Sequence, residues 1–203
     1  MMNNVLKDYY KRLLDTVSNF KVEQAEAVAE AFIECHKKDG TVYIFGNGGS
    51  GSTASHICGD FLKGVSYGLE RRFKMICFND NNSSFSAISN DISYDDVFVE
   101  PLKNFLKSGD LVIGISGSGN STNVVKALEY AKKSGAKTVA MCGYKGGKIK
   151  EIADIHFHAE VMDMEITEDA HLITFHAVKQ AVISKLKGST SGSMGSQYDS
   201  RVK

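Results

Sequence analysis

Five short apolar runs, each followed by a segment that can be helical, constrain the fold of this chain more than any other feature. They lie at 41–46, 73–78, 111–116, 137–143 and 154–159. Their centres are continuously apolar, as in "LVIGIS", whereas a strand with one exposed face would alternate apolar and polar residues. Strands buried on both faces are typical of parallel sheets with helices on each side. The sequence therefore predicts an α/β fold with a doubly wound, five-stranded parallel sheet.

Helical segments and a polar tail surround these runs. Apolar residues at three- and four-residue spacing predict two N-terminal helices, at 5–17 and 22–37, and a last amphipathic helix at about 165–187. Residues 188–203 are small, polar and aperiodic, so we expect a disordered tail there. The predicted organisation is one domain, 1–187, that includes the N-terminal helices, followed by this tail.

Charge and composition exclude several classes of protein. The 203 residues include 24 basic and 24 acidic ones, so the chain lacks the overall positive charge expected of a nucleic-acid binder. No apolar run approaches the roughly 18 to 20 residues of a membrane span, and the first residues lack the apolar centre of a signal peptide. We therefore expect a cytoplasmic protein with no nucleic-acid or membrane partner.

The cysteines agree with a reducing compartment. They are scattered without C-x-x-C spacing, and most of them lie inside apolar segments. Such cysteines are more often small buried apolar residues than disulfide partners or metal ligands. The four positions are Cys35, Cys58, Cys77 and Cys142.

Two glycine- and serine-rich turns open helices directly after predicted strands. They are "FGNGGSGS" after the first strand and "ISGSGNSTN" after the third. Ligands of doubly wound sheets bind outside the carboxyl ends of the strands, and a helix N-terminus offers unpaired amides with partial positive charge. Hydroxyls and amides without a nearby lysine suit a phosphomonoester, although a tight turn alone can also require glycine. The candidate ligand-binding residues are Asn47, Gly48, Gly49, Ser50, Ser116, Gly117, Ser118 and Ser121.

Other phosphate-binding motifs fit these turns poorly. Neither turn reads G-x-x-x-x-G-K-[ST], which disfavours a nucleoside triphosphatase. "GNGGSG" is also out of register with G-x-G-x-x-G, and Glu70, about 20 residues on, does not end a strand. The sequence therefore favours a phosphomonoester over a dinucleotide as the ligand of these turns.

Two pairs of residues have the types and spacing needed for proton transfer or metal binding. In "HICGD", His56 and Asp60 lie four residues apart, on one face of a helix. In the last helix, Glu168 and His176 lie eight residues apart, about 80° around the axis, so they can also share a face. Such pairs are more often surface ion pairs than sites, so spacing alone leaves both interpretations open.

Four motifs in this order and spacing resemble the sugar isomerase (SIS) domain family, and within it the phosphoheptose isomerases. They are "GNGGSGSTASH", "SAISND", "ISGSGNSTNVVKAL" and "ITEDAHLITFH". The resemblance covers about residues 3–187. It implies a five-stranded parallel sheet and isomerisation of sedoheptulose 7-phosphate to D-glycero-D-manno-heptose 7-phosphate. It also implies a homotetramer with active sites between subunits.

The resemblance assigns roles to individual residues. It implies phosphate contacts at Ser50, Ser116, Ser118 and Ser121. It makes Asp60 the catalytic base and His176 the proton-handling group, and it puts Asp91 near the sugar. His56 and Glu168 complete a zinc site with these two catalytic residues, one ion per active site.

Two of these positions depart from the family. Asp60 stands where glutamate is commoner, and Glu168 stands where glutamine is commoner. The resulting set of two histidines and two carboxylates is a plausible one for Zn²⁺. The departures bear on the identity of the sugar more than on the type of reaction.

Three other functions stay open at this point. One is a non-catalytic SIS protein that binds a replication initiator, but such proteins lose the acid–base residues that Asp60 and His176 supply here. Another is a sugar-phosphate sensor, which usually carries a DNA-binding domain that 38 N-terminal residues cannot provide. The third is an isomerase of a different sugar phosphate.

The N-terminal helices also predict assembly. They carry more apolar surface than a layer covering one sheet needs, so we expect them to pack between subunits. The apolar residues of the first helix include Val5, Leu6, Tyr9, Leu13, Leu14 and Val17.

Overall fold

The computed structural model describes residues 2–188 and contains the predicted five-stranded parallel sheet. The strand order is β2-β1-β3-β4-β5, and every neighbouring pair is parallel. The strands are β1 (Thr41–Gly46), β2 (Lys74–Cys77), β3 (Leu111–Ser116), β4 (Lys137–Cys142) and β5 (Ile155–His158). Apart from Gly188, the predicted tail lies outside the described residues.

Both faces of the sheet are buried, which explains the continuous apolar runs. In β1, Val42 and Ile44 point into one hydrophobic core, while Tyr43 and Phe45 point into the other. Because successive side chains of a strand point to opposite faces, a strand between two cores needs apolar residues at every position.

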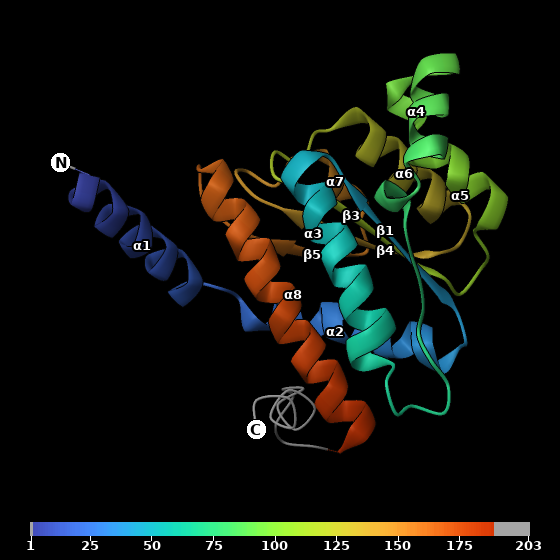
Figure 1. The fold of residues 1–203 in the computed structure, drawn as a ribbon, viewed down its shortest axis with the longest axis horizontal. Helices are drawn as coiled ribbons and strands as arrows, with labels where there is room; N and C mark the ends of the chain where they lie inside the picture. Colours follow the sequence, from blue (N-terminus) through green and yellow to red (C-terminus); the bar gives the residue numbers. More distant parts are fainter. Residues whose placement is uncertain (1, 189–203) are drawn as a thin grey trace.

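Helices cover the two faces in separate layers (Figure 1). One core contains residues of α2, α3 and α8, and the other contains residues of α5, α6 and α7. The first three span Val22–Lys37, Gly48–Gly59 and Met164–Lys187, and the second three span Val99–Phe105, Thr122–Lys133 and Gly147–Ile152. The remaining elements are α4 (Asn82–Asp91), the 3₁₀ turns η2 (Phe78–Asp80) and η3 (Tyr94–Asp96), and η1 (Asp60–Val65).

The strand order puts a topological switch point between β1 and β3. From β1 the chain moves to β2 on one side, and then returns to β3 on the other side. Crevices at such a switch point are where open α/β sheets bind ligands. The turn after β1 opens α3 and the turn after β3 opens α6, so both glycine- and serine-rich turns lie at this switch point.

Helix α1 (Met2–Ser18) projects away from the rest of the chain (Figure 1), and none of its residues is buried. Two polar contacts join it to the start of α8. The hydroxyl of Tyr9 donates to the Asp169 carboxylate at 2.6 Å, and Arg12 pairs with Asp163. Its apolar side chains stay exposed, among them Val5 at 66%.

The longest helix, α8, has 24 residues and a conventional N-terminal cap. The Asp163 carboxylate accepts a hydrogen bond from the amide of Ile166 at 3.1 Å, which satisfies one of the unpaired amides of the first turn. No helix among residues 2–188 is long and apolar enough to cross a membrane.

All four cysteines are buried and free, as predicted. Burial disfavours the charged thiolate and raises the pKa of each thiol, to about 12 for Cys77. Thiols with such high pKa values react slowly with oxidants and bind metals poorly. Their role is therefore in packing.

Candidate active site

The first candidate pair lies where helix α3 changes its geometry. His56 is in the last turn of α3, and Asp60 begins the π-helical turn η1 that continues the same helix. Within η1, the amide of Ser66 donates to the carbonyl of Phe61, five residues back, at 3.0 Å. Single π-helical turns within helices are frequent at functional sites, because the extra residue re-aims neighbouring side chains.

Three of the predicted residues converge. The Nε2 atoms of His56 and His176, which are 120 positions apart in the chain, lie 3.0 Å from each other. The Oδ2 atom of Asp60 lies 3.6 Å from each of them. Helix α8 supplies His176, and α3 with η1 supplies the other two, so the packing of these helices creates the group.

This group has the donors and spacing of a metal site. Ligands bound at about 2.0–2.2 Å to a tetrahedral ion lie roughly 3.3–3.5 Å from one another, close to the distances found here. The Oδ2 atom of Asp60 is buried and has no hydrogen-bond partner among the described residues. Since a buried charged oxygen without a partner is costly, a cation between these three atoms would satisfy it. The residues present therefore fit a divalent metal held by His56, Asp60 and His176.

The fourth predicted metal ligand, Glu168, lies outside this group. Its carboxylate packs on the first turn of α3, so close that a Cβ atom added to Gly49 would lie 2.3 Å from Oε2. A side chain at 49 would therefore displace the Glu168 carboxylate from this position. Burial raises the pKa of Glu168, and the nearby carboxylates of Glu165 and Asp169 add to that effect.

The electrostatics of the group favour a neutral His176. Burial lowers its pKa, and the neighbouring His56 and Lys179 act in the same direction, while Asp60 opposes them. A neutral imidazole can accept a proton at one nitrogen and donate one at the other. His176 can therefore carry protons in both directions at neutral pH.

Lys179 is a member of the site that we did not predict from the sequence. Its Nζ atom lies 2.8 Å from Oδ1 of Asp60. Lys179 follows His176 by three residues in α8, so helical spacing puts the two on one face. That spacing was the available signal, but it does not distinguish Lys179 from other lysines of the helix.

The first glycine- and serine-rich turn is tied to the second by side-chain amides. Asn47 is the residue before α3, and its amide group exchanges hydrogen bonds of 2.9 and 3.0 Å with that of the buried Asn123 in α6. The hydroxyl of Tyr94 also donates to Asn47, at 2.9 Å. Next to it, Gly48 has φ +52°, a conformation that favours glycine. Asn123 and Tyr94 were not among the predicted residues.

The second turn presents paired hydroxyls at the start of α6. The Oγ atoms of Ser116 and Ser121 lie 3.0 Å apart, and Ser121 is the residue before α6. Its hydroxyl makes no capping bond to the amides of α6 within the described chain. The amide of Val124 donates to the side chain of Asn123 at 2.9 Å, so an anion at this helix start would meet the amides that precede it. Ser118 Oγ accepts from the amide of Asn120 at 3.2 Å. At Gly119 a Cβ atom would lie 1.9 Å from the carbonyl of Gly146.

Two further candidates lie in the loops around these turns. Gly117, in the second turn, is covered by Met164, whose sulfur would be 2.6 Å from a Cβ atom added there. Asp91 ends α4, is exposed, and accepts a hydrogen bond from the amide of its neighbour Asn90 at 2.7 Å. No hydrogen bond or ion pair within residues 2–188 joins Asp91 to the other candidates, so its role stays a prediction.

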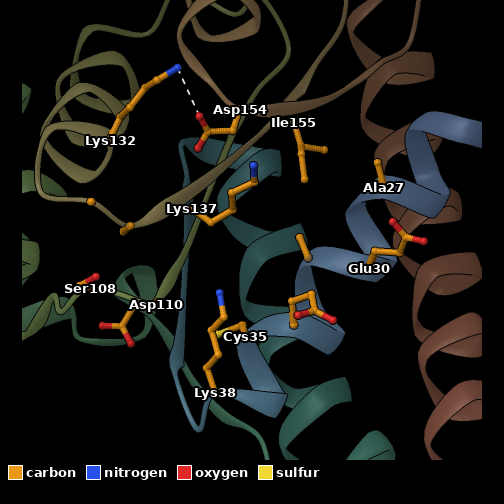
Figure 2. A pocket seen from close by; sticks show the side chains of 15 residues that line it. Ala27, Glu30, Cys35, Lys38, Ser108, Asp110, Lys132, Lys137, Asp154 and Ile155 are labelled. Atoms are coloured by element: carbon orange, nitrogen blue, oxygen red, sulfur yellow. Dashed lines mark ion pairs between the residues drawn. The ribbon is translucent and has the colours of Figure 1, made fainter.

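A hollow of about 990 Å³ at the opposite edge of the sheet contains none of the candidate residues (Figure 2). It lies at the amino ends of the strands, where Asp154 pairs with Lys132 at 3.3 Å. Another of its carboxylates, that of Asp110, accepts a hydrogen bond from the amide of Thr41 at 2.8 Å. These acidic groups support strand ends, whereas the two glycine- and serine-rich turns follow the carboxyl ends of β1 and β3.

Comparison with known proteins finds sequence relatives along most of the chain. Residues 7–143 match the SIS domain family. The probable phosphoheptose isomerase of Thermoplasma volcanium is 36% identical over 88% of this chain and 91% of its own length. The phosphoheptose isomerase of Aliarcobacter butzleri is 33% identical over 92% of this chain and 99% of its own length.

Solved structures agree in fold. The phosphoheptose isomerase of Neisseria gonorrhoeae superposes with a TM-score of 0.84 at 24% identity, covering 91% of this chain and 100% of that one. The family match and the extended sequence similarity lead to one assignment. The chain belongs to the SIS domain family, in its phosphoheptose isomerase branch.

Proposed function

We propose that this chain isomerises sedoheptulose 7-phosphate to D-glycero-D-manno-heptose 7-phosphate through a cis-enediol. The observation that carries the proposal is the convergence of a carboxylate and two imidazoles, Asp60 with His56 and His176, at the end of a helix that begins at one of two turns suited to phosphate. Relatives named phosphoheptose isomerases, similar along most of their length, support the same reaction. The buried free cysteines support a cytoplasmic location.

The reaction moves two protons, and the site offers a group for each. Asp60 removes a proton from C1 of the ketose and returns it to C2 of the enediol. His176 takes the proton of the O1 hydroxyl and delivers one to O2, so that an aldehyde forms at C1. Its lowered pKa suits this exchange, because the neutral imidazole is present at neutral pH.

We also propose one Zn²⁺ per active site, held by His56, Asp60 and His176. When bound, the ion would act as a Lewis acid toward the oxygens of the sugar. Glu168 packs over Gly49. To act as a fourth ligand, its side chain would have to turn toward the group.

The direct test is to incubate the protein with sedoheptulose 7-phosphate and follow aldose formation. Turnover of this sugar supports the proposal, and turnover only of other sugar phosphates would assign a different substrate. No turnover of any of them would favour a non-catalytic partner of a replication initiator or a sensor. The acid–base residues make that alternative the less favoured one.

Phosphate anchoring is expected to depend on neutral hydroxyls. Replacing Ser116 and Ser121 together with alanine removes two donors, each contributing about 0.5 to 1.5 kcal/mol. Affinity for the sugar phosphate should fall about 5- to 140-fold, since about 1.4 kcal/mol is a factor of ten. The measurement is KM, supported by calorimetric titration with the sugar phosphate.

The matched control is Ser134→Ala, at the far end of α6 and exposed. It should leave KM unchanged, and thermal melting should show that both proteins are folded. If the double variant binds the sugar phosphate as tightly as the natural protein, the second turn does not hold phosphate.

A homotetramer with active sites between subunits is part of the proposal. The exposed apolar residues of α1 form an apolar surface of the kind that marks protein–protein interfaces. They include Leu6 and Leu14. Light scattering at micromolar concentration should give about four times the mass of the chain. Leu6→Glu with Leu14→Glu should reduce it, whereas a monomeric mass for the natural protein contradicts the assembly.

A further inference from the structure

Lys179 forms an ion pair with Asp60, the proposed catalytic carboxylate. Its Nζ atom lies 2.8 Å from Oδ1 of Asp60, and the lysine side chain is 16% exposed. An ion pair withdrawn from solvent in this way is screened less than a surface pair. The ion pair between Lys179 and Asp60 therefore contributes to the electrostatics of the site.

The two oxygens of Asp60 have different surroundings. Oδ1 pairs with the ammonium group of Lys179, whereas Oδ2 faces the imidazoles of His56 and His176 at 3.6 Å and has no hydrogen bond to any residue of the range 2–188. A divalent ion among the three donor atoms would therefore share one carboxylate with the lysine. The two oxygens of one carboxylate lie much closer together than the screening length of about 8 Å at physiological ionic strength. Salt would therefore screen little of the repulsion between the ammonium on Oδ1 and an ion on Oδ2.

We infer that Lys179 is a resident cation that lowers the affinity of this site for divalent metal. It neutralises the single negative charge of the donor group, and it repels a second cation bound to the other oxygen of Asp60. It also holds the carboxylate with Oδ2 toward the imidazoles, so Asp60 keeps its orientation when no metal is bound. The inference concerns the site of the proposed function, but it needs no particular sugar to be correct.

The test is titration of Zn²⁺ into the natural protein and three variants by calorimetry. Lys179→Met removes both the charge and the hydrogen bond, and it should bind Zn²⁺ at least tenfold more tightly. Lys179→Gln keeps an N–H donor for Oδ1 but removes the charge, so it should also bind more tightly. Lys179→Arg retains the charge and should stay within about threefold of the natural protein.

Lys185→Met is the matched control, because Lys185 is an exposed lysine near the end of the same helix. It should leave the affinity for Zn²⁺ unchanged. Circular dichroism checks that each variant folds, and Lys179→Gln still decides the matter if Lys179→Met does not.

Two results would overturn the inference. One is unchanged or weaker Zn²⁺ binding by both neutral variants, and the other is equal tightening by Lys179→Arg. Within the first result, weaker binding by Lys179→Met with normal binding by Lys179→Gln would mean that the hydrogen bond of Lys179 supports the metal ligand and that its charge does not matter. Turnover of sedoheptulose 7-phosphate is measured separately, so failure of the proposed function leaves the metal titration interpretable.

Discussion

Asp60→Asn should reduce the turnover number for sedoheptulose 7-phosphate by about 10²- to 10⁴-fold, the range that a positioned general base contributes. Asparagine has nearly the same size but cannot accept the carbon-bound proton. Because the sugar phosphate is proposed to be anchored by the two turns, KM should change little. Steady-state rates of aldose formation measure both quantities.

Two features make this variant informative. The amide can still lie between Lys179 and the two imidazoles, so a loss of rate reflects the loss of basicity. The control is Asp39→Asn, before β1, whose carboxylate pairs with exposed Lys74 at 2.5 Å. Asp39 has φ +56°, which asparagine also tolerates. Normal turnover by Asp60→Asn would show that another residue is the base.

His176→Gln should lose both turnover and most of the bound metal. Glutamine cannot transfer a proton at neutral pH, so the exchange between O1 and O2 should slow by about 10²- to 10⁴-fold. It also removes one of three donor nitrogens and oxygens that lie within 4.8 Å of one another. Turnover is measured by the same assay, and zinc per chain by mass spectrometry after dialysis.

His156→Gln is the control for this variant, since His156 lies in β5 and belongs to no part of the site. It should retain both properties. Loss of turnover with full retention of zinc would remove His176 from the metal group while keeping it as the proton carrier. Retention of turnover would contradict its catalytic role.

Much of the architecture was predictable from the chain because it depends on local pattern. Continuous apolar runs such as 111–116 require burial on both faces, and that requirement leads to a parallel sheet with two helical layers. The carboxyl ends of such strands lie on one edge, so the two glycine- and serine-rich turns could be assigned to one crevice. Helical periodicity likewise put His56 and Asp60 on a common face.

Tertiary packing decided which faces meet. Periodicity also allowed Glu168 and His176 to share a face, yet Glu168 packs on Gly49 while His176 joins His56 and Asp60. The π-helical turn that begins at Asp60 has no clear mark in the sequence, and neither does the contact that brings in Lys179. The physical reason is that spacing along a helix determines which residues lie side by side, whereas the position of α8 against α3 determines what each of them touches.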